Sequence, residues 1–239
     1  MKLLVAMVTS YFLLTVSAFA YEFGPDSDKI TNPYMKMQIG NWSFKQGVGS
    51  IWNGRVIYMM AVGKEVVSGA KIGTQTYNNV KCLKIHLVIT DDGGDNDNEF
   101  FIMSFAQDIE GNVWLVKIYA PAHNITALLG GDYWKSMFMP ATPTVGNSAG
   151  LKMPEDNDNY CEVAQVGIQS ITTNFGTYSD CIKVECYDED PNDTEVDYFC
   201  KDVGSVRSYD AIDPSNVADL KDYGTEKMNN KVVVIPLGD

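Results

Sequence analysis

The densest group of oxygen-bearing side chains in the sequence lies in one short acidic loop. The run from Asp91 to Glu99 contains five carboxylates, two glycines and two asparagines. Hard oxygen donors of this kind suit Ca²⁺, although an EF-hand would need a carboxylate twelve positions into its loop and flanking helices, which are absent. The alternative is a solvated hairpin tip, because acidic turns recur along this chain. The candidate calcium ligands are Asp91, Asp92, Asp95, Asp97 and Glu99.

The cysteines suggest disulfide chemistry rather than zinc binding. The chain has five cysteines, no CxxC motif and two histidines, so paired zinc knuckles are excluded. An odd number leaves at least one thiol free or paired between chains. If the strands around the second acidic turn pair with a register centred near Asp193, the Cβ atoms of Cys186 and Cys200 approach within about 4 Å. Cys186 and Cys200 are therefore the disulfide candidate.

No catalytic set can be assembled from the sequence. Residues 146–150 match the GxSxG pattern of a nucleophile elbow, but no histidine follows Ser148, as the Ser–acid–His order requires. A turn is the better interpretation. His86 and His123 lack an evident nucleophile or orienting acid. With 31 acidic residues, no carboxylate pair of the glycosidase type can be selected. The sequence therefore assigns no catalytic residue and no cofactor other than the candidate Ca²⁺.

Strands, rather than helices, position these residues. Apolar side chains alternate at Leu83, Ile85, Leu87 and Ile89, which is typical of a half-buried strand. The acidic loop then interrupts the pattern, and residues 99–106 resume it, which predicts a β-hairpin. Another strand is expected at residues 113–119. Helix is scarce, with one candidate at residues 214–221, and a last strand is expected at residues 231–235.

The strand pattern returns about a hundred residues later. Residues 178–186 can be laid on residues 78–86 so that Cys181 meets Cys82 and Lys183 meets Lys84, and an acidic turn and strands again follow. Such self-similarity predicts an internal repeat. The expected fold is mainly antiparallel β, with two similar β-units at about 34–119 and 140–209 forming a curved or half-barrel-like sheet with little helix. Residues 120–159 are mainly connecting structure.

The first residues predict export. Met1 to Ala20 carry one positive charge, at Lys2, then an uncharged apolar run ending in a small-x-small site. This is the pattern of a cleavable signal peptide. A membrane anchor is the alternative, but polar residues interrupt the run, which is short for a roughly 30 Å hydrocarbon core. We expect a secreted or periplasmic chain of a single β-rich domain, 21–239, without a membrane span after cleavage.

The charge of the chain limits its partners. The formal net charge is −13, and 45% of the residues are hydrophobic. Nucleic acids and anionic lipid surfaces are bound through clustered lysine and arginine, so this acidic protein is expected to bind neither as its main partner. The apolar fraction is ample for a folded core, which argues against disorder.

Four groups of short motifs occur in an order that resembles a family of uncharacterised secreted bacterial β-rich proteins, with NPY…GxxW, AQDxxGNVW, MPAxPxVG and GxGxVK-like motifs. The resemblance covers about residues 31–207; here Gly40 is not preceded by proline, and the late motif is reduced at residues 199–207. It implies secretion and a β-rich fold akin to the curved half-barrel sheets of periplasmic lipoprotein carriers, and it implies no reaction. The matching residues are Asn32-Pro33-Tyr34 with Gly40-Asn41-Trp42, Ala106-Gln107-Asp108 with Gly111-Asn112-Val113-Trp114, Met139-Pro140-Ala141 with Pro143-Thr144-Val145-Gly146, and Gly176-Thr177-Tyr178 with Cys181 and Lys183.

Three classes of function remain open. The first is a non-catalytic secreted protein that binds a small apolar ligand or an envelope component. The second is a secreted hydrolase that uses a carboxylate pair, and the third is an assembly protein with an exposed strand edge. A pocket lined by Trp, Phe, Tyr and Met would favour binding. A cleft with two inward carboxylates, or with His86 beside one, would favour catalysis.

Overall fold

The computed structural model describes residues 21–48, 55–90, 99–130, 137–150, 160–187 and 194–225. The predicted signal peptide, most of the candidate calcium loop and the expected strand at residues 231–235 lie outside these ranges. All structural statements below concern the described residues.

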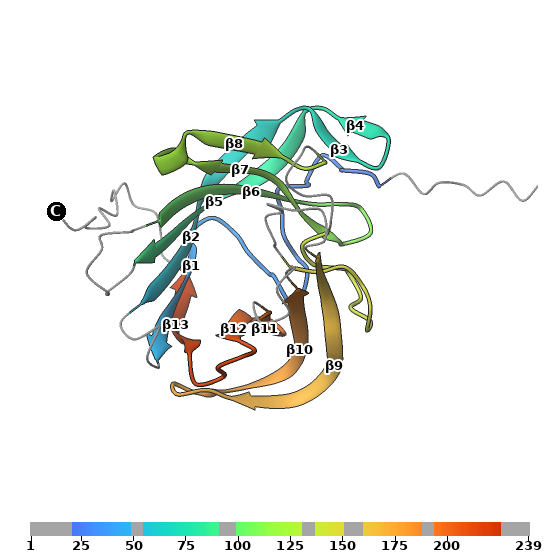
Figure 1. Ribbon diagram of the computed structural model, residues 1–239. Coiled ribbons are helices and arrows are strands. Elements are labelled where there is room, and N and C mark those ends of the chain that lie inside the picture. Colours follow the sequence, from blue (N-terminus) through green and yellow to red (C-terminus); the bar gives the residue numbers. More distant parts are fainter. Residues whose placement is uncertain are drawn as a thin grey trace, which may run out of the picture.

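The fold is one large antiparallel sheet of eleven strands, curved around a hollow side (Figure 1). The spatial order is β8-β7-β6-β5-β2-β1-β13-β12-β11-β10-β9, so β8 and β9 are the two edges. A two-stranded ribbon, β3–β4, and one short 3₁₀ helix, η1, complete the described elements. The expectation of a mainly antiparallel, curved β fold with little helix is confirmed. The elements are β1 (Asn41–Val48), β2 (Val56–Val67), β3 (Ala70–Ile72), β4 (Gln75–Tyr77), β5 (Val80–Thr90), β6 (Glu99–Gln107), β7 (Val113–Ala120), η1 (Pro121–His123), β8 (Ile125–Leu128), β9 (Tyr160–Thr172), β10 (Thr177–Tyr187), β11 (Glu195–Cys200), β12 (Gly204–Asp210) and β13 (Val217–Thr225).

The helix expected at residues 214–221 is wrong, because β13 occupies most of that range. The Asp213 side chain accepts hydrogen bonds from the backbone N–H of Ser215 and from Asn216 Nδ2, and so caps a turn instead of a helix. Residues 217–220 that follow are all buried. A segment buried on both faces lacks the alternation that distinguishes a strand from a helix.

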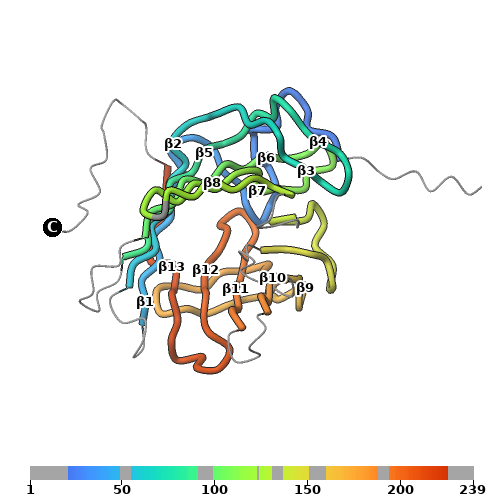
Figure 2. The backbone as a smooth tube through the Cα atoms, turned by 45° about the horizontal axis from the view of Figure 1, so that its top comes forward, coloured from blue at the N-terminus to red at the C-terminus, as the bar shows by residue number. Residues whose placement is uncertain are grey.

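The sheet consists of two five-stranded meanders joined through β1. One meander runs β2-β5-β6-β7-β8 and the other β9-β10-β11-β12-β13, and β1 pairs with β2 on one side and with β13 on the other. Figure 2 shows β5–β8 above and β9–β13 below, facing each other.

The two meanders share details of register. In one meander, Phe105 on its third strand, β6, lies opposite Leu83 on its second strand, β5. In the other meander, Phe199 on the third strand, β11, lies opposite Ile182 on the second strand, β10. A register shift toward the fourth strand falls next to each phenylalanine, between Ser104 and Phe105 and between Tyr198 and Phe199. That the two halves arose by duplication stays a prediction.

Two disulfides cross-link neighbouring strands of the second meander, and their pairing differs from the predicted one. The bridges are Cys161–Cys186 and Cys181–Cys200, so the Cys186–Cys200 candidate is wrong. The β10–β11 hairpin pairs Cys181 with Cys200 and places Cys186 opposite Glu195, so its register is centred before Asp193. The fifth cysteine, Cys82, is free and buried, as the odd count allows.

The tip of the long β9–β10 hairpin folds onto β13. The backbone N–H and the Nδ2 of Asn174 both donate to Asp219 Oδ2, at 2.8 and 2.9 Å. Arg207 on β12 also holds this fully buried carboxylate, with Nε 2.6 Å from Oδ1 and Nη2 2.9 Å from Oδ2. These contacts tie the hairpin tip and β12 to the same buried carboxylate on β13.

Candidate functional site

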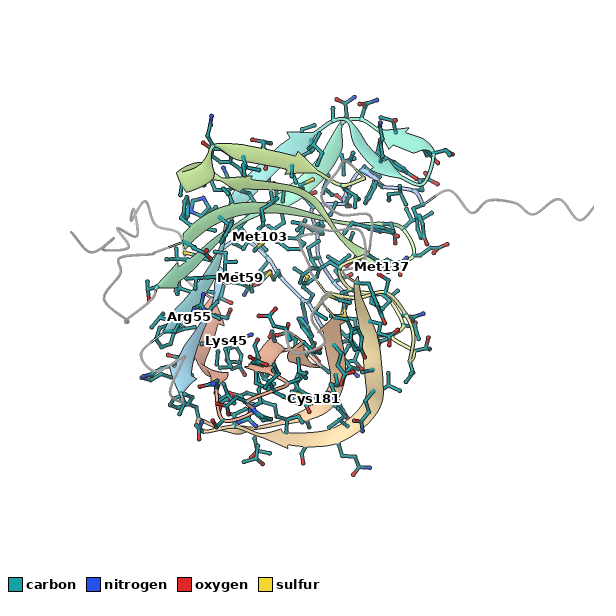
Figure 3. The ribbon with its side chains drawn as sticks, in the orientation of Figure 1. Lys45, Arg55, Met59, Met103, Met137 and Cys181 are labelled. Carbon is teal, nitrogen blue, oxygen red and sulfur yellow. A yellow bond between two sulfur atoms is a disulfide. The ribbon has the colours of Figure 1, made fainter. Side chains whose placement is uncertain are left out.

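The hollow side of the sheet contains a cavity of about 960 Å³. Alternation along the strands directs apolar side chains into it, as predicted for the face of β5 that carries Leu83, Leu87 and Ile89. Figure 3 shows Met59 and Met103 on the inner side of the curved sheet. The apolar wall consists of Ile57 and Met59 on β2, Leu83, Leu87 and Ile89 on β5, Met103 and Phe105 on β6, Phe199 on β11, and Phe138.

An N-terminal segment, residues 27–40, crosses the hollow side and forms another wall of the cavity (Figure 1). At the end that leads into β1, Gly40 N donates a backbone hydrogen bond to Ala61 O on β2. At its other end Gln107 N donates to Ser27 O at 2.7 Å. In its middle Asp202 N donates to Pro33 O at 2.7 Å. Contacts to both meanders therefore hold this segment across the cavity.

Asn32 attaches the N-terminal segment most extensively. It is 2% exposed, and its Nδ2 donates to Pro140 O at 2.9 Å and to Gly111 O at 3.1 Å. Its Oδ1 accepts the N–H of Tyr34 at 3.0 Å. Beside it, the backbone N–H of Asn32 donates to Gln107 Oε1 at 2.9 Å. The residues of the NPY, AQD, GNVW and MPA motifs thus meet at one place.

The β6–β7 turn, residues 108–112, is built around the buried carboxylate of Asp108. Its Oδ1 accepts the backbone N–H groups of Glu110 and Asn112, and its Oδ2 accepts Asn112 Nδ2 and Trp114 Nε1. Asn112 Oδ1 in turn accepts the N–H of Ala141 at 2.9 Å. These hydrogen bonds of Asp108 and Asn112 stabilise the turn and the neighbouring loop. Trp114 lies in the core and does not line the cavity.

A polar cluster interrupts the apolar cavity wall. It consists of Lys45 on β1, Asp197 on β11, and Ser205 and Ser208 on β12, and is called the Lys45 cluster below. Lys45 Nζ lies 2.5 Å from Ser205 Oγ, 2.7 Å from Ser208 Oγ and 3.7 Å from Asp197 Oδ1. Ser208 donates its hydroxyl proton to Asp197 Oδ1. Burial lowers the pKa of Lys45, and the neighbouring Asp197 carboxylate opposes that shift.

Ion pairs neutralise the carboxylates that line the cavity. Lys64 pairs with Asp28, and Lys36 pairs with Asp202 at 3.5 Å, while Lys45 lies beside Asp197. Among the described lining residues there are four lysines and three aspartates, in a chain whose formal net charge is −13. The cavity is therefore much less acidic than the protein as a whole.

The predicted site residues are not brought together at the cavity. Of the candidate calcium ligands only Glu99 is described, and no metal-ligating group of three or more side chains occurs in the described ranges. His86 packs edge-on against Phe100, with ring centroids 5.1 Å apart; burial and Lys84 lower its pKa. Ser148 forms an isolated bridge with Glu162, in a loop rather than at a strand–helix elbow.

No sequence pattern indicated the Lys45 cluster. Lysine, aspartate and serine in strands usually face solvent, and these four residues are up to 163 positions apart. Only the pairing of β1 with β13 and of β12 with β11 and β13 brings them to one wall. The apolar wall, by contrast, was visible in the alternation along β5.

The geometry defines a class: a β-rich protein whose single curved sheet, crossed by an N-terminal segment, encloses a largely apolar cavity. No helix within the described ranges has the length and apolar character needed to cross a membrane.

No protein-family model and no curated protein matches the chain. Among solved structures, it is similar to the crystal structure of a "putative lipoprotein" from Parabacteroides distasonis, at 14% identity and a TM-score of 0.34. The similarity covers 81% of this chain and 99% of that chain. A TM-score this low carries no inference about function.

Proposed function

We propose that the protein is a non-catalytic binding protein that holds a small, mainly apolar molecule in the cavity of its curved sheet. The observation that carries the proposal is the cavity itself, about 960 Å³ in volume and lined by methionine, leucine, isoleucine and phenylalanine. Cavities that hold drug-sized ligands measure roughly 300–1,000 Å³ and have walls of this kind. Flexible methionines such as Met59 and Met103 adapt to ligands of different shape.

The arrangement of charged groups favours binding over hydrolysis by a carboxylate pair. Glycosidase chemistry needs two carboxyl groups, one of them a proton donor, on either side of the substrate. The lining carboxylates Asp28, Asp197 and Asp202 each have a lysine partner, so none of them is placed as a free proton donor. His86 packs against Phe100 and does not line the cavity.

The two serines beside Lys45 do not support a serine–lysine nucleophile either. Such a mechanism requires a neutral lysine that accepts the serine proton. Here Lys45 donates to both hydroxyls, and Ser208 donates its proton to Asp197. Burial lowers the pKa of Lys45, but the Asp197 carboxylate 3.7 Å from Nζ opposes that shift and is an ion-pair partner of the ammonium. Binding is the simpler use of this geometry.

We place the protein outside the cytoplasm, secreted or periplasmic, as the predicted signal peptide suggests. The two intrachain disulfides support this location, because such bonds persist in oxidising compartments and are rare in the cytosol. The sequence resemblance to secreted bacterial proteins agrees with the same location.

A fluorescent apolar probe tests the proposed function. The neutral dye N-phenyl-1-naphthylamine should bind the protein saturably, with increased emission from the apolar cavity. Met59→Trp fills the cavity from β2 and should weaken this binding about tenfold, or about 1.4 kcal/mol. Val66→Trp is the matched control, because Val66 lies on the same strand, is 61% exposed and does not line the cavity. Absence of saturable binding by the folded wild-type protein would refute the proposal.

A further inference from the structure

We infer that the cavity selects a single-chain amphiphile with an anionic head, such as a fatty-acid-like carboxylate, and that Lys45 receives the head. This inference rests on the proposed function and adds the class of ligand and its orientation. The acyl chain would lie along the apolar wall of β2, β5 and β6, and the head would lie at β1 and β12.

The first argument is the cost of placing Lys45 where it lies. Lys45 is only 9% exposed, and burying an ammonium group among strands is unfavourable even beside a carboxylate. Lys45 lies on the same face of β1 as Asn41 and Ser43, which also line the cavity, so the alternation of the strand directs it inward. Figure 3 shows Lys45 on the inner side of the sheet, across the hollow from Met103.

The second argument is the hydrogen bonding of the ammonium group. Lys45 Nζ has three N–H donors, of which two reach Ser205 and Ser208 at 2.5 and 2.7 Å. The third contact of Nζ, to Asp197 Oδ1, is longer at 3.7 Å. A ligand oxygen that approaches Nζ more closely would compete with this contact for the third donor. Ser205 and Ser208 also line the cavity, so their hydroxyls are within reach of the same head.

The third argument is the sign of the charge. The lining carries four lysines and three aspartates, and each of these aspartates has a lysine partner. An anionic head in the cavity therefore meets no unpaired carboxylate, whereas a cationic head would meet the ammonium of Lys45. The surrounding chain, with a formal net charge of −13, repels anions from the rest of the surface and leaves the cavity as the favourable place for them.

The volume accommodates a single chain. The cavity of about 960 Å³ is at the upper end of the range occupied by one drug-sized molecule, roughly 300–1,000 Å³. A chain of about twelve carbons is therefore a suitable probe, and its short length keeps the free amphiphile monomeric at low concentrations.

Displacement of N-phenyl-1-naphthylamine by three amphiphiles with the same chain distinguishes the contribution of the head to binding from that of the tail. Dodecanoate should displace the dye from the wild-type protein at a concentration at least about tenfold lower than dodecanol, and dodecylammonium should be weaker than dodecanol. The double variant Lys45→Met with Asp197→Asn removes both charges, which avoids leaving a lone buried charge. It should still bind the dye and dodecanol, but should lose the preference for dodecanoate.

Two further variants serve as controls. Asp197→Asn alone keeps Lys45 and removes its neighbouring negative charge, so the preference for dodecanoate should increase. Lys71→Met, at an exposed position on β3 outside the cavity, should leave the preference unchanged.

The outcomes distinguish this inference from the proposed function. Equal displacement by dodecanoate and dodecanol, with the dye still bound saturably, would overturn the assignment of the head and leave the proposed function standing. Retention of the dodecanoate preference in the Lys45→Met, Asp197→Asn variant would overturn the role of Lys45. Failure of the wild-type protein to bind dye or any amphiphile would overturn both proposals.

Discussion

Replacing Asn32 by alanine removes the side chain that fixes the N-terminal segment across the cavity. The change leaves the carbonyl groups of Gly111 and Pro140 and the N–H of Tyr34 without their side-chain partner. A hydrogen bond of this kind contributes about 0.5–1.5 kcal/mol net, and buried groups left unpaired cost more. Three such bonds give an expected loss of about 2–4 kcal/mol in the free energy of unfolding.

Urea denaturation followed by circular dichroism measures that loss, and hydrogen exchange locates it. Because Asn32 is bonded to the β6–β7 turn and to the loop at Pro140, exchange should accelerate first in residues 30–37 and 108–112. The dye should also bind more weakly, since the N-terminal segment forms part of the cavity wall. Asn32→Asp should be at least as damaging, because it keeps the acceptor for Tyr34 but loses both donated bonds.

Asn78→Ala is the matched control. Asn78 accepts one exposed hydrogen bond, from Gly69 N at 3.1 Å, and its loss should cost well under about 1 kcal/mol. If Asn32→Ala were no more destabilising than Asn78→Ala, the attachment of the N-terminal segment by Asn32 would be disproved.

Three other predictions concern stability and redox state. Arg207→Met leaves the fully buried Asp219 without its cation and should lower the free energy of unfolding by about 3 kcal/mol in urea; a loss below about 1 kcal/mol would contradict the ion pair. Burial alone raises the pKa of Glu65, but bonds from Ser104 and Lys117 outweigh it and hold that pKa below its usual 4.5. Glu65 therefore adds stability that is present above pH 4.5 and lost as the pH falls through the folded pKa, so Glu65→Gln should flatten the acid side of the stability–pH curve, and an unchanged curve would oppose this. Thiol titration of the unfolded, unreduced protein should count one thiol, from Cys82, and five after reduction; any other count before reduction would contradict the two bridges.

Local patterns predicted β5, β6 and β7, but no local expectation covered β1, β2 or β9. The alternation at Leu83, Ile85, Leu87 and Ile89 identified β5 and its apolar face, and the structure shows that Leu83, Leu87 and Ile89 of that face line the cavity. The acidic loop after it marked the β5–β6 hairpin, whose strands pair as expected. These predictions succeeded because a strand's two faces and a turn's residue types are encoded within a few neighbouring positions.

Register and strand order could not be predicted in the same way. The disulfide prediction failed because a shift of a few residues in the β10–β11 hairpin changes which cysteines are opposite each other. The predicted helix at residues 214–221 failed because burial of β13 on both faces removed the alternation that identifies a strand. Both outcomes depend on what packs against the segment, not on the segment itself.

Composition and period-two patterns, which are local properties, were enough to indicate the β-rich class, the acidic charge and the alternation of β5. The odd cysteine count indicated at least one thiol outside the intrachain bridges. The motif residues Asn32 and Asp108 were visible in the sequence, but the bond from Asn32 to the turn that Asp108 builds was not. The strand order, in which β1 joins the two meanders and brings Lys45 beside Asp197 on an apolar wall, came from the three-dimensional structure alone. The cavity is enclosed by strands that lie far apart in the chain. The order of these strands depends on how the whole sheet buries its apolar faces, which no local pattern encodes.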